Sequence, residues 1–386
     1  MDSINRHPLI TDDHRNYREK IRTFAEKEIK GIARQLDKEN RFSVELTKKM
    51  GKLGLLGIQI PKVYGGQELD TLSYIIAVEE LARIDGSQAA TIAAHNSLGL
   101  YPIYKYGTDA QKEKYLPKLS SGDQLWAFGI TEPTAGSDAQ GVKTKAELQG
   151  DKWLINGSKI FITNSASDMS AGVTIQAVTG EKNGKPELSA ILVDKDTKGF
   201  TRGFISGKLM WRAADTGRLF FQNSIVPKEN LLGEKGQGAR IMLETLDGGR
   251  LSIAAMGLGL AQGAYEMAKE YALNRNQFGR PISKFQTVAF KLADMNKKIE
   301  LARNTLYNAC WLKDQGEPFG REAAISKLYC SEIAKEVADE AVQIFGAYGL
   351  TDENDIERFY RDQRILQIGE GTSEILKLVI SRHIGI

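Results

Sequence analysis

The chain has few of the residues that build metal centres and disulfides. It contains two cysteines and four histidines among 386 residues. Cys310 and Cys330 stand in helix-like sequence without CxxC spacing, and the histidines fall in no recognised ligand spacing. Two free, buried thiols fit a reducing compartment better than they fit a disulfide or a metal site. We therefore expect no metal.

A strong charge and long apolar runs are also missing. The 52 basic and 49 acidic residues leave a net charge of +3, which gives no strong field for holding nucleic acid or an anionic membrane. No apolar run reaches transmembrane length, so we expect no membrane span. Neither a Rossmann GxGxxG nor a Walker GKS pattern occurs, which argues against a nucleotide held on a βαβ unit.

Length and periodicity predict three domains in an α+β fold that is mostly α. Apolar residues recur at helical spacing from residue 11 to about residue 119, including one predicted helix at 89–106. Short β-branched runs separated by Gly, Asn and Asp follow, and 180–187 reads as a hairpin tip. Helical spacing then persists to the end. The expected domains are a helical one at 1–120, an antiparallel β domain at 121–234 and a four-helix bundle at 235–386.

One carboxylate near the C-terminus stands between two glycines. Glu370 lies in the string QIGEGTSEI, after an apolar run and before a segment that resumes helical spacing. Gly369 and Gly371 allow a positive φ and a close approach by something bulky. A solvated loop is the ordinary alternative for such a glutamate. The flanking glycines favour a side chain that is held toward a ligand.

At this stretch the chain resembles the acyl-CoA dehydrogenase family, which carries the similar segment RDxxIxxIYEGTSEI. The resemblance extends from about Ile10 to the end, with several motifs in the family's order. It implies two helical domains packed together, a β domain at one side, and a cleft between them. It also implies that Glu370 is the catalytic base and that the substrate is an acyl-CoA thioester.

A second motif, TEPTAGSD at 131–138, supplies hydroxyls, backbone N–H groups and small residues that suit the edge of a heteroaromatic ring. An ordinary β turn is the alternative. The family pattern ITEPxAGSD cradles the ring of FAD, and the string KIFITN is similar to the family's KxWITN, in which an aromatic residue shields the flavin. For Phe161 a core aromatic is the alternative. The resemblance implies flavin contacts by Phe128, Ile130, Thr131, Gly136, Ser137, Phe161 and Thr163.

Further cofactor contacts are implied by three segments that lie later in the chain. RNQFGRPI and the Gln of the FQ that follows it are similar to a family segment that reaches FAD bound mainly by a neighbouring subunit. QIFGA is similar to a family segment near the adenosine phosphate, and TSE follows the base itself. The implied contacts are Arg275, Phe278, Gln286, Gln343, Gly346, Ala347, Thr372 and Glu374. A lone arginine such as Arg275 is more often a surface residue. If the resemblance holds, FAD binding requires at least a dimer, and the expected assembly is a homotetramer built as two dimers.

The string LDGGR, which we expect to open a helix behind the base, carries the substrate contacts. By resemblance, Asp247 contacts the CoA arm and Arg250 lies near the thioester, with Ser137 and Gly371 also against the substrate. Two subfamilies place their base on this helix. Here those positions are Gly248 and Gly249, which have no acidic group, so Glu370 is the candidate that remains.

The resemblance implies FAD-dependent α,β-dehydrogenation of an acyl-CoA in fatty acid metabolism and β-oxidation. Glu370 would take the α proton, flavin N5 would accept the β hydride, and the backbone N–H of Glu370 would bind the thioester carbonyl. Burial would raise the pKa of Glu370 toward neutrality. Gly369 stands where many straight-chain members have Tyr. We therefore expect a short- to medium-chain, branched or cyclic acyl group.

Several alternatives stay open at this point. The reaction can run as an enoyl-CoA reductase, the fold can serve an acyl-CoA oxidase or flavin monooxygenase, or the chain can be a non-catalytic flavin-binding interaction protein. For a dehydrogenase, the expected electron partner is an electron-transfer flavoprotein. No apolar leader follows Met1. We expect a bacterial cytoplasmic protein, or a mitochondrial matrix protein if the sequence is a trimmed eukaryotic one.

Overall fold

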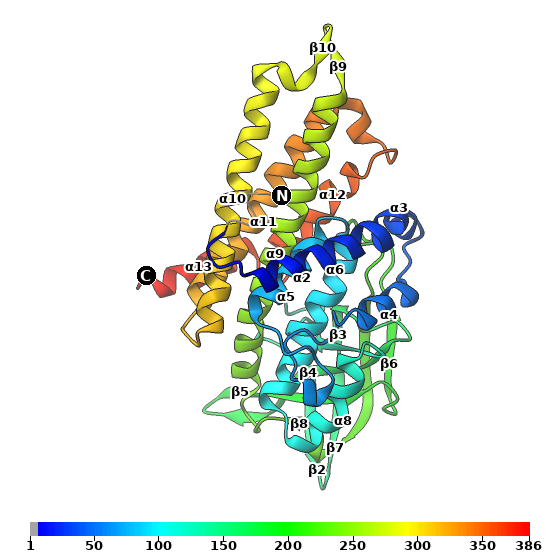
Figure 1. The fold of residues 1–386 in the computed structure, drawn as a ribbon. Coiled ribbons are helices and arrows are strands. Elements are labelled where there is room, and N and C mark those ends of the chain that lie inside the picture. Colours follow the sequence, from blue (N-terminus) through cyan, green and yellow to red (C-terminus); the bar gives the residue numbers. More distant parts are fainter. Residues whose placement is uncertain (1–6) are drawn as a thin grey trace.

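The computed structural model describes residues 7–386, which form helices, then a sheet, then helices (Figure 1). This is the order expected from the sequence. The first part contains α2 (Asp12–Phe24), the π-helix η1 (Ala25–Ile29), α3 (Lys30–Glu39), α4 (Val44–Lys52), the 3-10 turn η2 (Lys62–Tyr64), α5 (Thr71–Ala82), α6 (Gly86–Ala94), the π-helix η3 (His95–Leu100), α7 (Tyr101–Tyr106) and α8 (Asp109–Ser120). No described helix is both long and apolar enough to cross a membrane.

The predicted helix at 89–106 continues through a wider turn, the π-helix η3. His95 fixes this turn against the sheet: its Nδ1 accepts from the backbone N–H of Trp126 at 3.2 Å, and its Nε2 donates to the carbonyl of Leu119 at 3.0 Å. Burial lowers the pKa of His95 to about 4, so the ring is neutral and can both accept and donate. His95 is therefore a structural residue that joins η3 to β1.

The middle part is one eight-stranded sheet. Its strands are β1 (Leu125–Gly129), β2 (Lys145–Gln149), β3 (Lys152–Thr163), β4 (Ser170–Lys182), β5 (Lys185–Asp194), β6 (Phe200–Phe204), β7 (Thr216–Pro227) and β8 (Leu231–Leu232), with the 3-10 turn η4 (Lys228–Asn230) before β8. The order is β6-β7-β3-β2-β4-β5-β8, and β1 pairs with β4. The pairing is mostly antiparallel, while β1 and β2 meet β4 in parallel. The expected hairpin tip is present at Asn183 and Gly184, which both have positive φ.

The last part is a helical bundle. It contains α9 (Gly238–Asn274), the short hairpin β9 (Asn276–Gln277) and β10 (Arg280–Pro281), η5 (Ile282–Lys284), α10 (Gln286–Asp314), α11 (Gly320–Phe345), η6 (Gly346–Leu350), α12 (Ile356–Asp362), η7 (Gln363–Gln367) and α13 (Ser373–His383). The expectation that LDGGR opens a helix is wrong, because α9 runs without a break through Gly248 and Gly249. Packing of α9 against α5 and α11 outweighs the weak helix propensity of two glycines.

Buried ion pairs join the first and last parts of the chain. On α5, Glu80 accepts from Arg18 of α2 at 2.9 Å, and Glu79 accepts from Arg303 of α10 at 3.1 Å. All four side chains are buried, so each charge depends on its partners for stabilisation. The ion pairs fix α2, α5 and α10 relative to one another.

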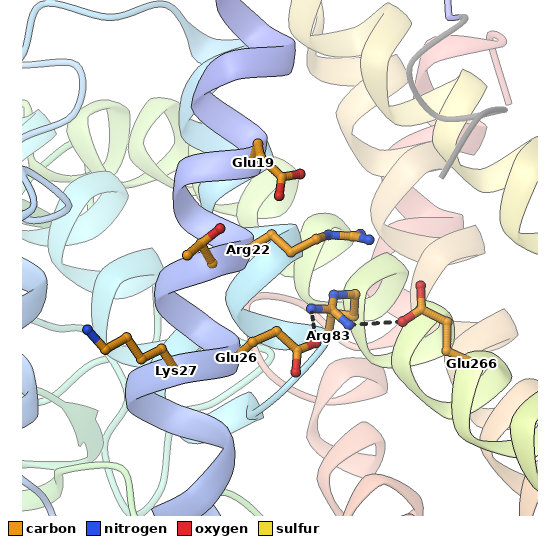
Figure 2. A pocket seen from close by; sticks show the side chains of 7 residues that line it. Glu19, Arg22, Glu26, Lys27, Arg83 and Glu266 are labelled. Carbon is orange, nitrogen blue, oxygen red and sulfur yellow. Dashed lines mark hydrogen bonds and ion pairs between the residues drawn. The ribbon is translucent and has the colours of Figure 1, made fainter.

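The same network borders a surface hollow of about 720 Å³ (Figure 2). In this hollow Arg83 pairs with Glu26 at 2.6 Å and with Glu266 at 2.9 Å, so its guanidinium is already neutralised. The hollow is lined by Glu19, Arg22, Thr23, Glu26, Lys27, Arg83 and Glu266. None of these is among the residues that the sequence singled out. We interpret the hollow as a seam between packed helices.

Candidate active site

Glu370 lies on the turn between η7 and α13, and its own backbone is in the left-handed region. Its φ is 52°, and Gly371 has a φ of 99°. The expected positive φ is therefore present, but at Glu370 and Gly371 rather than at both glycines. A left-handed conformation costs a residue with a Cβ about 1 to 2 kcal/mol. The surrounding structure must hold the turn in this form.

The carboxylate of Glu370 points at α9. A Cβ on Gly249 would overlap Oε2 of Glu370 and would lie 3.1 Å from its Cδ and 3.2 Å from Leu98 of η3. Oε2 is buried and has no hydrogen-bond partner in the described part of the chain. Gly249 therefore provides the space that Glu370 occupies, and the alternative of a solvated loop does not apply.

Burial and two cations decide the charge state of Glu370. Burial raises the pKa of Glu370 to about 7, and the positive charges of Lys327 and Arg250 oppose that rise. A carboxylate that titrates near neutral pH is a far better base than an ordinary glutamate. The arrangement suits removal of a weakly acidic proton.

Asp247 and Arg250, two of the predicted substrate residues, lie beside this position on α9. Nη1 of Arg250 donates to Oδ1 of Asp247 at 2.5 Å, and Nε of Arg250 is buried without a partner among the described residues. Burial raises the pKa of Asp247, although Arg250 opposes the shift. Gly371 belongs to the Glu370 turn itself. Arg250 and Gly371 are thus close to the carboxylate of Glu370, and Asp247 is joined to them through Arg250.

Lys327 of α11 is a site residue that sequence reasoning missed. Its buried Nζ donates to the carbonyl of Gly371 at 2.5 Å. A local signal was available. On α11, positions 323, 324, 327, 330 and 331 form one buried stripe in which the lysine stands among small residues. A lysine on such a stripe is rare unless it has a specific partner.

The residues expected around the flavin ring gather where β1 and β3 meet. Phe128 is the penultimate residue of β1. The carbonyl of Thr131, just after this strand, accepts from the N–H of Ile160 in β3 at 2.9 Å. Next to it, Phe161 stands at a bulge with a φ of 60° and 64% of its surface exposed. An exposed aromatic residue held in a strained conformation suggests a ligand-binding surface.

The turn after β1 is anchored by a buried ion pair. Nζ of Lys159 donates to Oε1 of Glu132 at 2.8 Å and to the carbonyl of Ile130 at 3.0 Å. The turn itself leaves Gly136 and Ser137 exposed, and Thr163 lies partly buried at the far end of β3. The predicted ring contacts therefore lie together where β1 and β3 end, a surface that we call the Phe161 edge.

Helix α6 and η3 connect this edge to Glu370. A Cβ on Gly99 would lie 2.5 Å from the carbonyl of Trp126 in β1, while the neighbouring Leu98 faces Gly249. Nδ2 of Asn164, at the end of β3, donates to the carbonyl of Thr91 in α6 at 3.0 Å. The flavin edge and the carboxylate thus meet the same helical segment.

The remaining predicted cofactor residues form a separate group. Phe278, on the β9–β10 hairpin at the far end of the long helices, is 91% exposed (Figure 1). With Gln343 it lines a groove of about 290 Å³. The other members are Arg275, which stacks on Tyr348, and the exposed Gln286, Gly346 and Ala347. Within one chain this group is not brought to the Glu370 turn.

Thr372 and Glu374 begin α13, directly after the carboxylate. Oγ1 of Thr372 accepts from the N–H of Ile375 at 3.2 Å and caps the helix, while Glu374 is exposed. Within residues 7–386 no group of three His, Cys, Asp or Glu side chains could hold a metal ion. The exposed Phe161 edge fits a flat organic cofactor such as FAD better than it fits a buried ion.

Family models match nearly the whole chain. The acyl-CoA dehydrogenase N-terminal, middle and C-terminal domain models match residues 11–123, 127–224 and 236–385. The short-chain specific acyl-CoA dehydrogenase of Clostridium acetobutylicum is 45% identical over 97% of this chain and 98% of its own.

Two solved structures are similar over nearly all of this chain. Butyryl-CoA dehydrogenase from Megasphaera elsdenii has 42% identity and a TM-score of 0.94, with 97% of this chain and 98% of that chain covered. Acyl-CoA dehydrogenase from Bacillus anthracis, solved with FAD, has 34% identity and a TM-score of 0.91, with 97% and 67% covered. The chain therefore belongs to the acyl-CoA dehydrogenase family.

Proposed function

We propose that Glu370 is the base in an FAD-dependent α,β-dehydrogenation of a short-chain acyl-CoA. The observation that carries this proposal is the carboxylate itself, buried without a hydrogen-bond partner in the space above Gly249 and with its pKa raised to about 7 by burial. A structural glutamate would be paired or solvated. A base for a weakly acidic α carbon needs this environment.

The chain's own groups account for the proton and for the developing charge. Glu370 removes the α proton. The backbone N–H of Glu370 has no partner in the described part of the chain, so it is free to donate to the thioester carbonyl and stabilise the enolate. Arg250 and Asp247 lie beside this point and would position the thioester and the CoA arm. FAD, when bound along the Phe161 edge, supplies the oxidant that accepts the β hydride.

The acyl group and the assembly are proposed from the relatives, from Gly369 and from the exposed group around Phe278. The relatives named for short-chain and butyryl substrates favour a short chain, while Gly369 leaves room for a branch or ring near the reacting carbons. The exposed group around Phe278 suits FAD of a second subunit, as in the expected tetramer. Electron-transfer flavoprotein is the proposed acceptor. Two free, buried cysteines and a bacterial relative fit a bacterial cytoplasm.

Anaerobic flavin bleaching by acyl-CoA tests the assignment. We expect purified protein to be yellow and to bleach with butyryl-CoA, and Glu370→Gln to keep its flavin but lose bleaching by several orders of magnitude. Glu113→Gln, which neutralises an exposed carboxylate on α8 that has no predicted role in the site, is the control. If Glu370→Gln bleaches at the wild-type rate, the assignment is wrong. Rapid reoxidation by air would favour an oxidase instead.

A further inference from the structure

The turn that carries Glu370 is tied to α11 by a single side chain. Lys327 is 0% exposed, and its Nζ donates to the carbonyl of Gly371 at 2.5 Å. Residues 369–372 also make hydrogen bonds to the flanking η7 and α13, but within the part of the chain that is described Lys327 gives them their one hydrogen bond from a helix that does not adjoin the turn. A strained turn needs such support, because the left-handed backbone of Glu370 is unfavourable by itself.

Lys327 also brings an unbalanced positive charge to the site. No carboxylate lies within 4.0 Å of its Nζ among the described residues, so its direct partner is a neutral carbonyl. A buried ammonium without a carboxylate is costly, and burial lowers the pKa of Lys327 to about 8 while Glu370 opposes the shift. The ionised form of Glu370 is the charge that stabilises it.

The other charged and titratable groups near Glu370 do not replace this effect. On α9, Arg250 is partly neutralised by Asp247 at 2.5 Å. On α5, burial raises the pKa of Tyr74, which is therefore neutral. On α13, Glu374 is exposed. Two positive charges oppose the effect of burial on the pKa of Glu370, and Lys327 has a stronger influence than Arg250.

We propose that Lys327 is a positioning residue for the dehydrogenation, which holds the Glu370–Gly371 turn in its catalytic shape and places a positive charge beside the carboxylate. This inference rests on the proposed role of Glu370 as base. It assigns two separable effects to one ammonium group: a hydrogen bond to the turn and a charge beside the base.

Three substitutions separate the two effects. Lys327→Arg keeps charge and donor, Lys327→Gln keeps a donor without charge, and Lys327→Met removes both. Lys335→Met, on an exposed position of α11, is the matched control. The readout is the rate of anaerobic flavin bleaching by butyryl-CoA in single turnover, measured on holoenzyme across the pH range in which Glu370 ionises.

Because only ionised Glu370 accepts a proton, the rate rises with pH through the pKa of Glu370. We expect the midpoint to rise by about one pH unit in Lys327→Gln and Lys327→Met and to stay in place in Lys327→Arg and Lys335→Met. The rate at high pH should fall most in Lys327→Met. If Lys327→Met does not fold, the midpoint of Lys327→Gln still tests the effect of removing the charge.

An unchanged midpoint in the neutral variants would overturn the proposal, even if the maximal rate falls, since a purely structural lysine would lower the rate at every pH. An unchanged midpoint would not by itself reject the proposed function. The role of Glu370 as base is tested separately by Glu370→Gln in the wild-type background. If Glu370→Gln abolishes bleaching and the Lys327 series leaves the midpoint in place, Glu370 is the base and Lys327 has no electrostatic role.

Discussion

The carboxylate of Glu370 fills the space that a side chain on Gly249 would need. A Cβ at position 249 would overlap Oε2 of Glu370, whereas a Cβ at Gly248 would meet only Nζ of Lys313 at 3.8 Å. Two adjacent glycines in the interior of α9 thus have different reasons to be glycine. Residues 249 and 370 are 121 positions apart and share one site.

Gly249→Ala should therefore displace the base, and Gly248→Ala should not. We expect the first to lower kcat by at least about tenfold, because a shift of the carboxylate of about 1 Å costs much of its effect. Each alanine adds up to about 1 kcal/mol of helix propensity, so neither variant should unfold. Steady-state turnover with butyryl-CoA, together with circular dichroism, measures both. Equal activity in the two variants would contradict the shared site.

Glu370→Gln should stabilise the folded protein at pH 8 but not at pH 5. The pKa of Glu370 is raised from about 4.5 in the unfolded chain to about 7 in the folded one, so ionising it costs stability as the pH rises through that window. Glutamine carries no such cost. The measurement is Tm of wild type and variant at both pH values, with Glu113→Gln, at an exposed position on α8, as control. A Tm difference that does not grow between pH 5 and pH 8 would count against a buried carboxylate with a raised pKa at Glu370.

Phe161→Gly should release FAD without destabilising the sheet. Glycine relieves the strained φ of 60°, and little buried contact is lost because the ring is 64% exposed. Loss of aromatic stacking should weaken FAD binding about three- to tenfold. The readout is FAD affinity from flavin fluorescence quenching. Phe220→Ala, at a comparably exposed position on β7, should leave affinity unchanged.

Glu79→Gln should be strongly destabilising. Arg303 and Arg18 would then be buried without one of their carboxylates, which typically costs about 3 to 5 kcal/mol. Urea unfolding followed by fluorescence measures the change. Asp294→Asn, which removes an exposed pair with Lys297, should cost less than about 1 kcal/mol. Comparable effects in the two variants would show that the buried network does not join the domains as described.

Gly369→Tyr should narrow the substrate range. Position 369 accepts a side chain, since its φ is not positive and a Cβ would lie 3.6 Å from the carbonyl of Ile365, an ordinary contact. We expect isobutyryl- and cyclohexanecarboxyl-CoA to lose more kcat/KM than butyryl-CoA, because the ring fills the space beside the reacting carbons. A wild-type preference for straight chains that the substitution leaves unchanged would reject the branched-substrate hypothesis.

The fold was predictable because its signals are local. Helical spacing, β-branched runs and the Asn183–Gly184 turn each act over a few residues, and family motifs identified Glu370. The prediction failed at LDGGR, where glycine pairs usually interrupt helices but tertiary packing keeps α9 intact. The family, the fold class and acyl-CoA dehydrogenation are confirmed, whereas the roles of individual site residues stay predictions.

Contacts between distant residues were outside the reach of local patterns. Nothing near Glu370 shows that Gly249 makes room for it, or that Lys327 donates to the carbonyl of Gly371, which is 44 positions from the lysine. The sequence likewise predicted a positive φ at Gly369 and Gly371, whereas the structure has it at Glu370 and Gly371. These features depend on how α9, α11 and the turn are packed.

The unfavourable backbone of Glu370 also limits what can be transplanted. In an isolated peptide spanning 365–376, the glutamate would relax toward the common right-handed or extended regions, since no α11 would oppose it. Grafting these twelve residues onto a foreign scaffold would therefore transfer the sequence around Glu370 without the orientation of its carboxylate. What makes the acid competent is the enclosure built by the rest of the polypeptide.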